Sequence, residues 1–157
     1  MGNTKLNNNW VFWFHDPTDN NWDITSYKKI YEMETIHDFW SLYNRIDSNI
    51  VENSMIFLMR KNIEPLWEHK DNMNGGSWSL KISKNEIKKN WDRISIALLG
   101  ENISLDKSNI INGISISPKK NFCIIKIWNR DKKYNIVSLL NRIDGVSFEG
   151  MIYKPHN

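Results

Sequence analysis

The chain has 157 residues, 40% of them hydrophobic and 25% charged, and one hydrophobic core is sufficient at this size. We expect a single domain over residues 10–157, preceded by a flexible polar segment over residues 1–9. The net charge of +3 tolerates an acidic ligand such as RNA phosphate, but it is too small for a polybasic coat. Without a long apolar run or a signal peptide, we expect a soluble cytoplasmic protein, with the nucleus as a further location, that does not bind membranes.

The N-terminal third of the chain alternates between strand and helix patterns. Aromatic residues on both faces predict a strand over residues 10–15, and a second strand follows over residues 27–33. Trp22 lies in the polar stretch between them, where an aromatic side chain can reach solvent. Thr35 and Asp38 resemble a capping box, and the apolar residues that follow at helical spacing predict a helix over residues 36–46.

The middle of the chain contains a long loop between two predicted strands, at residues 55–59 and 77–82. This loop carries Trp67 and Glu68, and a loop of this length is often functional. Ser83 and Glu86 form a second capping-box signature. A helical stripe of apolar residues then predicts a helix that stops at Gly100.

The C-terminal third predicts two paired strands, a third helix and a last strand, over residues 110–116, 122–128, 131–141 and 147–153. Lys119 and Lys120 lie in the turn between the paired strands. Cys123 lies in an apolar run, which favours a buried structural thiol. The elements lack the strict alternation of a doubly wound fold. This favours the α+β class, an antiparallel sheet with helices packed on one face.

Trp67 and Glu68 place a large aromatic face beside a carboxylate. With a second exposed tryptophan opposite, this pair can clamp a flat, positively charged base such as N7-methylated guanine, because indole faces attract cations. From the residues alone, a second interpretation stays open. An isolated exposed aromatic is often unremarkable, and Glu68 is then a solvated surface carboxylate.

Four motifs and the positions of all eight tryptophans resemble one known family, over Trp10 through Trp128. The family is eukaryotic translation initiation factor 4E, the messenger RNA cap-binding protein. The resemblance implies a single curved antiparallel sheet with three helices packed on its convex face and a cap slot on its concave face. The motifs are His37-Asp38-Phe39-Trp40-Ser41-Leu42-Tyr43-Asn44, Ile63-Glu64-Pro65-Leu66-Trp67-Glu68, Gly75-Gly76-Ser77-Trp78 and Leu99-Gly100-Glu101.

The same resemblance implies a role for each matching residue. Trp22 and Trp67 sandwich 7-methylguanine, Glu68 accepts hydrogen bonds from the guanine N1 and N2 groups, and Trp128 packs near the methyl group. Capped mRNA is then the ligand, the protein acts in translation initiation, and we expect a monomer without a cofactor. The other tryptophans, Trp10, Trp13, Trp78 and Trp91, lie within strand or helix patterns and are expected in the core.

The expected phosphate contacts depart from the family pattern. Lys119 falls on the first basic position of the family, whereas Asn121 and Ile124 replace two further basic positions. Lys120 and Lys126 can compensate, so the three lysines are candidates and Lys119 is the first of them. We hypothesise that the triphosphate is held by fewer charges than is usual in the family.

The family binds scaffold proteins and repressors on its helical face. Trp40 matches the tryptophan of that surface, and Ile36 and Gly100 lie nearby in the pattern. However, Asp92 and Arg93 occupy positions that are usually leucine and glutamate, so an apolar contact and a charge sign have both changed. We hypothesise that the chain recruits an altered scaffold protein with complementary charge, or none.

Two alternative functions remain at this point. The first is a cap-binding competitor that represses translation because it lacks normal scaffold recruitment. The second is a nucleotide-processing enzyme, in which a carboxylate in an aromatic slot acts as a base. The sequence supports the enzyme poorly, because its four histidines lack metal-ligand spacing and it has neither a glycine-rich phosphate loop nor a nucleophile motif. We therefore expect a binding protein without a metal.

Overall fold

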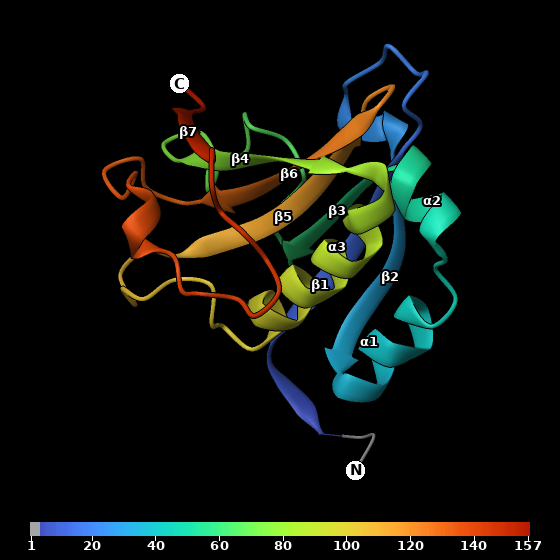
Figure 1. Cartoon of the computed structure of the whole chain (residues 1–157), viewed down its shortest axis with the longest axis horizontal. Coiled ribbons are helices and arrows are strands. Elements are labelled where there is room, and N and C mark those ends of the chain that lie inside the picture. Colours follow the sequence, from blue (N-terminus) through green and yellow to red (C-terminus); the bar gives the residue numbers. More distant parts are fainter. Residues whose placement is uncertain (1–3) are drawn as a thin grey trace.

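The computed structural model describes residues 4–157 and contains one antiparallel seven-stranded sheet (Figure 1). Its strand order is β2-β1-β3-β5-β6-β4-β7. The strands are β1 (Lys5–His15), β2 (Tyr27–Thr35), β3 (Met55–Arg60), β4 (Gly76–Ser83), β5 (Ile111–Pro118), β6 (Phe122–Asn129) and β7 (Ile152–Pro155).

The sheet is curved and is backed by three helices, α1 (Ile36–Tyr43), α2 (Ser48–Asn53) and α3 (Lys84–Leu99). Helix α3 contacts strands β1, β4, β5 and β6, whereas α1 packs beside β2 (Figure 1). This arrangement confirms the predicted α+β fold with a single sheet and three helices. No helix of residues 4–157 combines the length and the apolar character needed to cross a bilayer.

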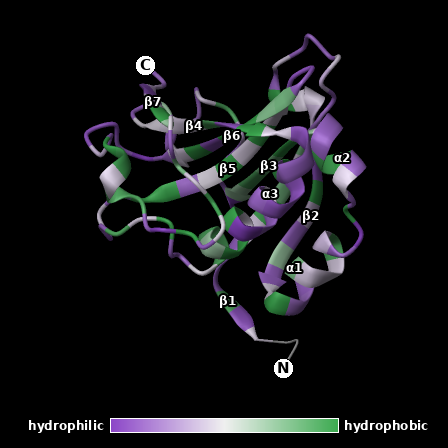
Figure 2. Cartoon of the chain, viewed as in Figure 1, coloured by the Kyte–Doolittle hydropathy of each residue, from purple (hydrophilic) through white to green (hydrophobic). Residues whose placement is uncertain are grey.

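Strand alternation divides the core into two clusters, one on each face of the sheet. The larger cluster lies under the helices and includes Trp10, Trp78 and Trp91, each at most 1% exposed. The smaller cluster lies on the opposite, concave face and includes Trp13 and Trp128. Trp10, Trp13, Trp78 and Trp91 are all buried, which confirms their prediction as core residues. In Figure 2 the ribbon of α3 carries many hydrophilic residues, while β5 and β6 carry hydrophobic stretches.

Helices α1 and α3 begin where the sequence predicts, but only α1 has the predicted capping hydrogen bonds. Thr35 and Asp38 form the predicted capping box, with 3.1 Å from the Asp38 amide to Thr35 Oγ1 and 3.0 Å from the Thr35 amide to Asp38 Oδ2. Helix α3 follows Ser83 as predicted, but the capping box there is wrong. The Ser83 hydroxyl donates to Asn85 Oδ1 at 2.7 Å instead of capping the helix.

The prediction of a third helix over residues 131–141 is wrong. This segment is a loop with only a short 3-10 turn at Val137–Leu139. The buried Asn129 amide donates to the backbone oxygens of Asp131 and Tyr134, at 3.1 and 2.8 Å, and so holds this segment as a loop. The third helix is instead α2, whose six residues are too few to show a period. Asp47 Oδ1 caps it by accepting from the Ile50 amide at 2.9 Å.

The first and last strands of the chain also differ from their predicted boundaries. Strand β1 begins at Lys5, which pairs with Thr35, so residues 5–9 of the segment predicted as flexible belong to the sheet. Residues 1–3 of that segment lie outside the described residues. The last strand was predicted over residues 147–153 and instead spans Ile152–Pro155, because Val146 and Phe148 pack against the core as a loop.

Candidate functional site

A cavity of about 350 Å³ opens on the concave face and brings together all four predicted base-binding residues. We call it the aromatic cavity. It lies within the size range of small-molecule sites and combines apolar walls with a few polar groups. Trp22, Trp67, Glu68, Trp128 and Lys126 all line it. Its other lining residues are Tyr27, Met55, Phe57, Pro65, Leu66, Ser115 and Ser117.

The loop that carries Trp67 and Glu68 is fixed by a buried asparagine beneath it. Asn72 donates through Nδ2 to the backbone oxygens of Glu64 and Leu66, at 3.1 and 2.9 Å. Asn72 Oδ1 in turn accepts from Asn112 Nδ2 at 2.9 Å, which links the loop to strand β5. These bonds are internal, so Trp67 can remain 47% exposed without the loop being loose. Loop length, the Trp67-Glu68 pair and the family motif pointed to this segment, but nothing in the sequence pattern distinguished Asn72.

Trp22, which comes from a different loop, is held by a buried histidine. Its ring stacks on His15, with ring centroids 4.2 Å apart and an interplanar angle of 7°. His15 is fully buried and its Nε2 lies 2.7 Å from the Asn21 carbonyl oxygen, to which it donates. Trp22 is 49% exposed, so one face rests on His15 while the side chain still lines the cavity.

The floor of the aromatic cavity is formed by Trp128, which is 7% exposed. Its Nε1 donates to Ser115 Oγ at 3.0 Å. Phe57 packs edge-on against its ring at 6.3 Å between centroids, and His156 does so at 5.0 Å. The indole is therefore satisfied and immobilised, which leaves it as an apolar contact surface.

Glu68 supplies a carboxylate near the rim of the cavity, and its side chain is exposed. Its charge acts on Tyr27, which lines the same cavity. Burial in the first place, and the Glu68 carboxylate in the second, raise the pKa of Tyr27 to about 12. Glu68 has no ion-pair partner among the described residues, so it is available to a ligand.

The predicted phosphate lysines do not all lie together. Lys119 and Lys120 are exposed and line none of the cavities described here, whereas Lys126 lines two. The second cavity, of about 290 Å³, adjoins the first and is called the lysine cavity. Lys154 and His156 line it, and the sequence patterns had marked neither of them. Their only sequence signal is proximity to the C-terminal strand, whose register becomes known only from the structure.

A separate apolar groove of about 290 Å³ lies on the helical side of the molecule. This helix-face groove brings together three of the predicted partner-binding residues, Ile36, Trp40 and Gly100, with Trp40 45% exposed. The predicted Asp92 and Arg93 do not line it. Its other lining residues are Leu6, Phe39, Ile96, Leu99 and Asn102.

Asp92 and Arg93 are occupied by contacts within the chain. Asp92 pairs with Lys88 one helical turn earlier, and Arg93 Nη1 donates to the Asp144 backbone oxygen at 2.6 Å. Burial raises the pKa of Asp92, and the Lys88 ammonium opposes that shift.

The fold and the aromatic cavity match one protein family. The family model of eukaryotic initiation factor 4E covers residues 5–157. The chain belongs to this family. The eukaryotic initiation factor 4E relatives include isoform 4E of Arabidopsis thaliana, 31% identical over 142 residues, which are 85% of this chain and 70% of that protein. Factor 4E-3 of the same plant is 31% identical over 129 residues, 79% of this chain and 53% of that protein. The chain therefore spans only about half the length of some relatives.

Solved structures of family members have the same fold. Caenorhabditis elegans eIF4E-3 in complex with the 4E-binding protein Mextli superposes with a TM-score of 0.81 at 23% identity, over 98% of this chain and 94% of that one. Ascaris suum eIF4E-3 in complex with m7G cap superposes with a TM-score of 0.76 at 26% identity, over 87% and 79%. A second complex of the C. elegans protein contains both Mextli and a cap analog, with a TM-score of 0.76 at 27% identity.

Proposed function

We propose that this chain binds the 7-methylguanosine cap of mRNA in the aromatic cavity and acts in translation initiation. The observation that carries the proposal is the convergence of Trp22, Trp67 and Glu68 on one cavity from two separate loops. The related Ascaris suum protein, crystallised with m7G cap, supports the choice of ligand. Residues 10–157 then act as a single cap-binding domain.

The proposed mechanism divides recognition between stacking and hydrogen bonding. Trp22 and Trp67 hold the methylated base between their rings, because methylation makes the purine cationic and indole faces attract cations. Glu68 accepts from the N1 and N2 groups, a donor pattern that adenine lacks. Trp128 packs against the methyl group from the floor.

The base contacts supply only part of the free energy of cap binding. Base stacking contributes about 1–3 kcal/mol per ring, and each hydrogen bond to a charged group contributes about 1.5–3 kcal/mol. Micromolar affinity requires about 8 kcal/mol, after the cost of immobilising the ligand. Base recognition alone therefore gives only weak binding, and the phosphate chain must add to it.

Calorimetric titration with 7-methyl-GTP and with GTP tests the proposal. We expect the wild type to prefer the methylated ligand and Glu68→Gln to bind both weakly. Trp67→Ala should lose the preference for methylation, because it removes one stacking face. Glu64→Gln is the matched control, since Glu64 lies in the same loop but lines a different cavity. Equal binding of the two nucleotides by the wild type would contradict cap recognition.

The helix-face groove supports a second proposal, that a partner protein docks there through a short amphipathic helix. The groove is apolar and exposes Trp40 and Ile36, and the related C. elegans protein was solved with the 4E-binding protein Mextli. Asp92 and Arg93 are engaged by contacts within the chain, so the charged residues available to the partner differ from those usual in the family. Trp40→Ala should abolish binding of such a peptide and leave 7-methyl-GTP binding intact. Ile50→Ala, an exposed apolar residue on α2, is the control.

The competitor and enzyme alternatives have separate tests. A translation extract depleted of its own cap-binding factor is rescued by an initiation factor, whereas a competitor without a scaffold partner fails to rescue it. Among residues 4–157 no group of histidine, cysteine, aspartate or glutamate side chains could hold a metal. We propose binding without turnover. Release of methylguanine nucleotides from capped RNA in the presence of the protein would instead establish an enzyme.

A further inference from the structure

The lysine cavity adjoins the aromatic cavity on the concave face. The two cavities share Trp67, Lys126 and Trp128, so they meet at the edge of the proposed base site. The remaining wall of the lysine cavity comes from strand β4, through Ser77 and Ser79, and from the C-terminal residues Lys154, Pro155 and His156. A ligand whose base lies in the aromatic cavity can therefore continue into the lysine cavity.

Strand register places the two lysines on the same face of the sheet. Ser79 on β4 pairs with Lys126 on β6, and Ser77 pairs with Lys154 on β7. Ser77 and Ser79 are two residues apart and share a face, so their partners point to the same side. Lys126 and Lys154 lie two strands apart and are offset by two residues along the sheet, a backbone separation of about 12 Å that two long side chains can close around an anion.

His156 forms part of the wall of the lysine cavity, and hydrogen bonds hold its ring in place. Its Nδ1 lies 2.8 Å from the Asn72 carbonyl oxygen and must donate to it, so Nε2 of the neutral ring accepts from the Ser77 hydroxyl at 2.8 Å. Both ring nitrogens are thus engaged. His156 shapes the wall and supports Trp128, and the lysines supply the charge.

The lysines of this surface lack carboxylate partners. None of the ion pairs formed by residues 4–157 involves Lys126, Lys154 or Lys119. Lys126 is half-buried, and its pKa is lowered first by burial and then by the charges of Lys119 and Lys154. A cation that is partly desolvated among like charges is stabilised by a bound anion.

We infer that Lys154, together with Lys126, forms an anion subsite that takes the phosphate chain of the capped 5′ end. The inference rests on the proposed function, because it assigns the phosphates of the same ligand. In this assignment Lys126 and Lys154 are the principal phosphate contacts, in place of the turn lysines Lys119 and Lys120. Lys119 acts at longer range through its charge, and Ser79 provides a hydroxyl donor between the two lysines.

Calorimetric titration of 7-methyl-GMP, 7-methyl-GDP and 7-methyl-GTP at several salt concentrations tests the subsite. We expect Lys154→Gln to weaken 7-methyl-GTP binding about fivefold, the upper range for one exposed ion pair, and to leave 7-methyl-GMP binding nearly unchanged. The slope of log affinity against log salt concentration should become shallower by the amount expected for the loss of about one phosphate contact. Lys154→Arg keeps the charge and should keep the slope.

The matched control is Lys89→Gln, which removes one exposed lysine from α3 on the opposite side of the sheet. It corrects for the change in net charge, and thermal melts of each variant establish that it is folded. If Lys154→Gln binds the three nucleotides with the affinities and salt slope of Lys89→Gln, the inference is overturned while cap binding stands. If the wild type does not prefer 7-methyl-GTP to GTP, the proposed function fails and the subsite falls with it.

Discussion

The Trp22 ring lies flat against His15, with centroids 4.2 Å apart and planes 7° from parallel. An exposed loop tryptophan is thereby held by a fully buried ring from strand β1, and Tyr27 packs on the same histidine at 4.6 Å. The stack orders one wall of the aromatic cavity before any ligand arrives. Preorganisation of this kind lowers the entropic cost of binding.

His15→Ala should therefore weaken 7-methyl-GTP binding although His15 does not line the aromatic cavity. An aromatic pair contributes about 0.5–1.5 kcal/mol beyond burial, and we expect a loss of binding free energy of that order. His15→Phe restores a flat ring and should recover most of the affinity. Calorimetry on the three proteins measures the effect. Equal affinity of His15→Ala and wild type would show that Trp22 is ordered by other contacts.

Asn72→Ala should act on the opposite wall. It removes two donors to the backbone of the Trp67 loop and leaves Asn112 without its side-chain partner. Buried groups left unsatisfied cost about 1–3 kcal/mol each, so we expect a lower melting temperature together with weaker cap binding. Asn74→Ala is the control, because Asn74 is exposed in the same loop. Unchanged binding and melting of Asn72→Ala would contradict a supporting role for Asn72.

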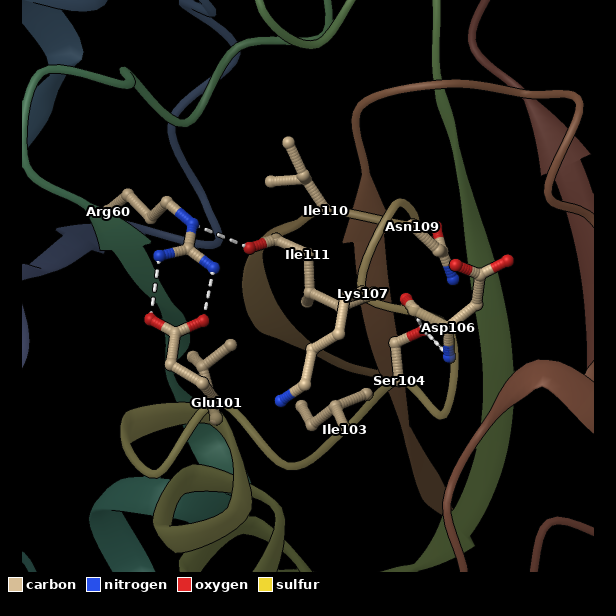
Figure 3. Close-up of a pocket in the computed structure, with 10 residues that line it drawn as sticks. Arg60, Glu101, Ile103, Ser104, Asp106, Lys107, Asn109, Ile110 and Ile111 are labelled. Atoms are coloured by element: carbon tan, nitrogen blue, oxygen red, sulfur yellow. Dashed lines mark hydrogen bonds and ion pairs between the residues drawn. The ribbon is translucent and has the colours of Figure 1, made fainter.

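Arg60 and Glu101 form a two-point ion pair at the other end of the sheet, with Nη1–Oε2 and Nη2–Oε1 distances of 2.8 and 2.6 Å (Figure 3). Arg60 Nε also donates to the Ile111 backbone oxygen at 2.8 Å (Figure 3), so the pair links β3, β5 and the end of α3. Burial raises the pKa of Glu101, but the hydrogen bonds and charge of Arg60 outweigh burial and hold it below its ordinary 4.5.

Glu101→Gln should lower stability at neutral pH by about 1–3 kcal/mol, because it removes a partly buried, bidentate charge pair. A carboxyl whose pKa is depressed by folding contributes stability above about pH 4.5 and loses it as the pH falls through the folded pKa. The difference between wild type and Glu101→Gln should therefore shrink in acid. Urea unfolding at pH 7 and pH 3.5 measures it, and a difference that stays constant would exclude this linkage.

Periodicity was sufficient to predict the elements that pack on the core. The helices at Ile36 and after Ser83, and six of the seven strands, follow directly from apolar spacing. Periodicity failed for residues 131–141, where a single side chain outside the segment determines its conformation. Asn129 holds the loop after β6 through backbone oxygens, and it also accepts from the Gly76 amide and from the Tyr153 hydroxyl, at 3.1 and 2.8 Å. No local pattern indicates such a contact.

The same limit applies to the candidate site. Trp22, Trp67 and Glu68 were visible in the sequence as loop residues, and the family resemblance supplied their roles, which stay predictions. Residue counting placed Lys119 first among the phosphate contacts, whereas strand pairing brings Lys126 and Lys154 to the cavity wall. Lys154 is 75 residues or more from its neighbours on β4, so only the tertiary fold reveals its position.

We expect His156 to make the attachment of the C-terminal strand sensitive to mild acid. Burial lowers its pKa from the ordinary 6.5, the hydrogen bond to the Asn72 backbone opposes this shift, and the Lys126 charge adds to it. The folded state thus favours the neutral ring, whose Nε2 accepts from Ser77. Because the unfolded chain takes up the proton first, the stabilisation is fully present above pH 6.5 and is lost as the pH falls toward the folded pKa.

We expect the melting temperature of the wild type to fall between pH 7.5 and pH 5.5 more than that of His156→Gln, which keeps a polar side chain but does not titrate. His37→Gln is the matched control, since His37 is an exposed histidine on α1. The same protonation withdraws support from Trp128, against which His156 packs, so affinity for 7-methyl-GTP should decline over the same interval. Parallel melting curves for wild type and His156→Gln would place the acid sensitivity elsewhere in the molecule.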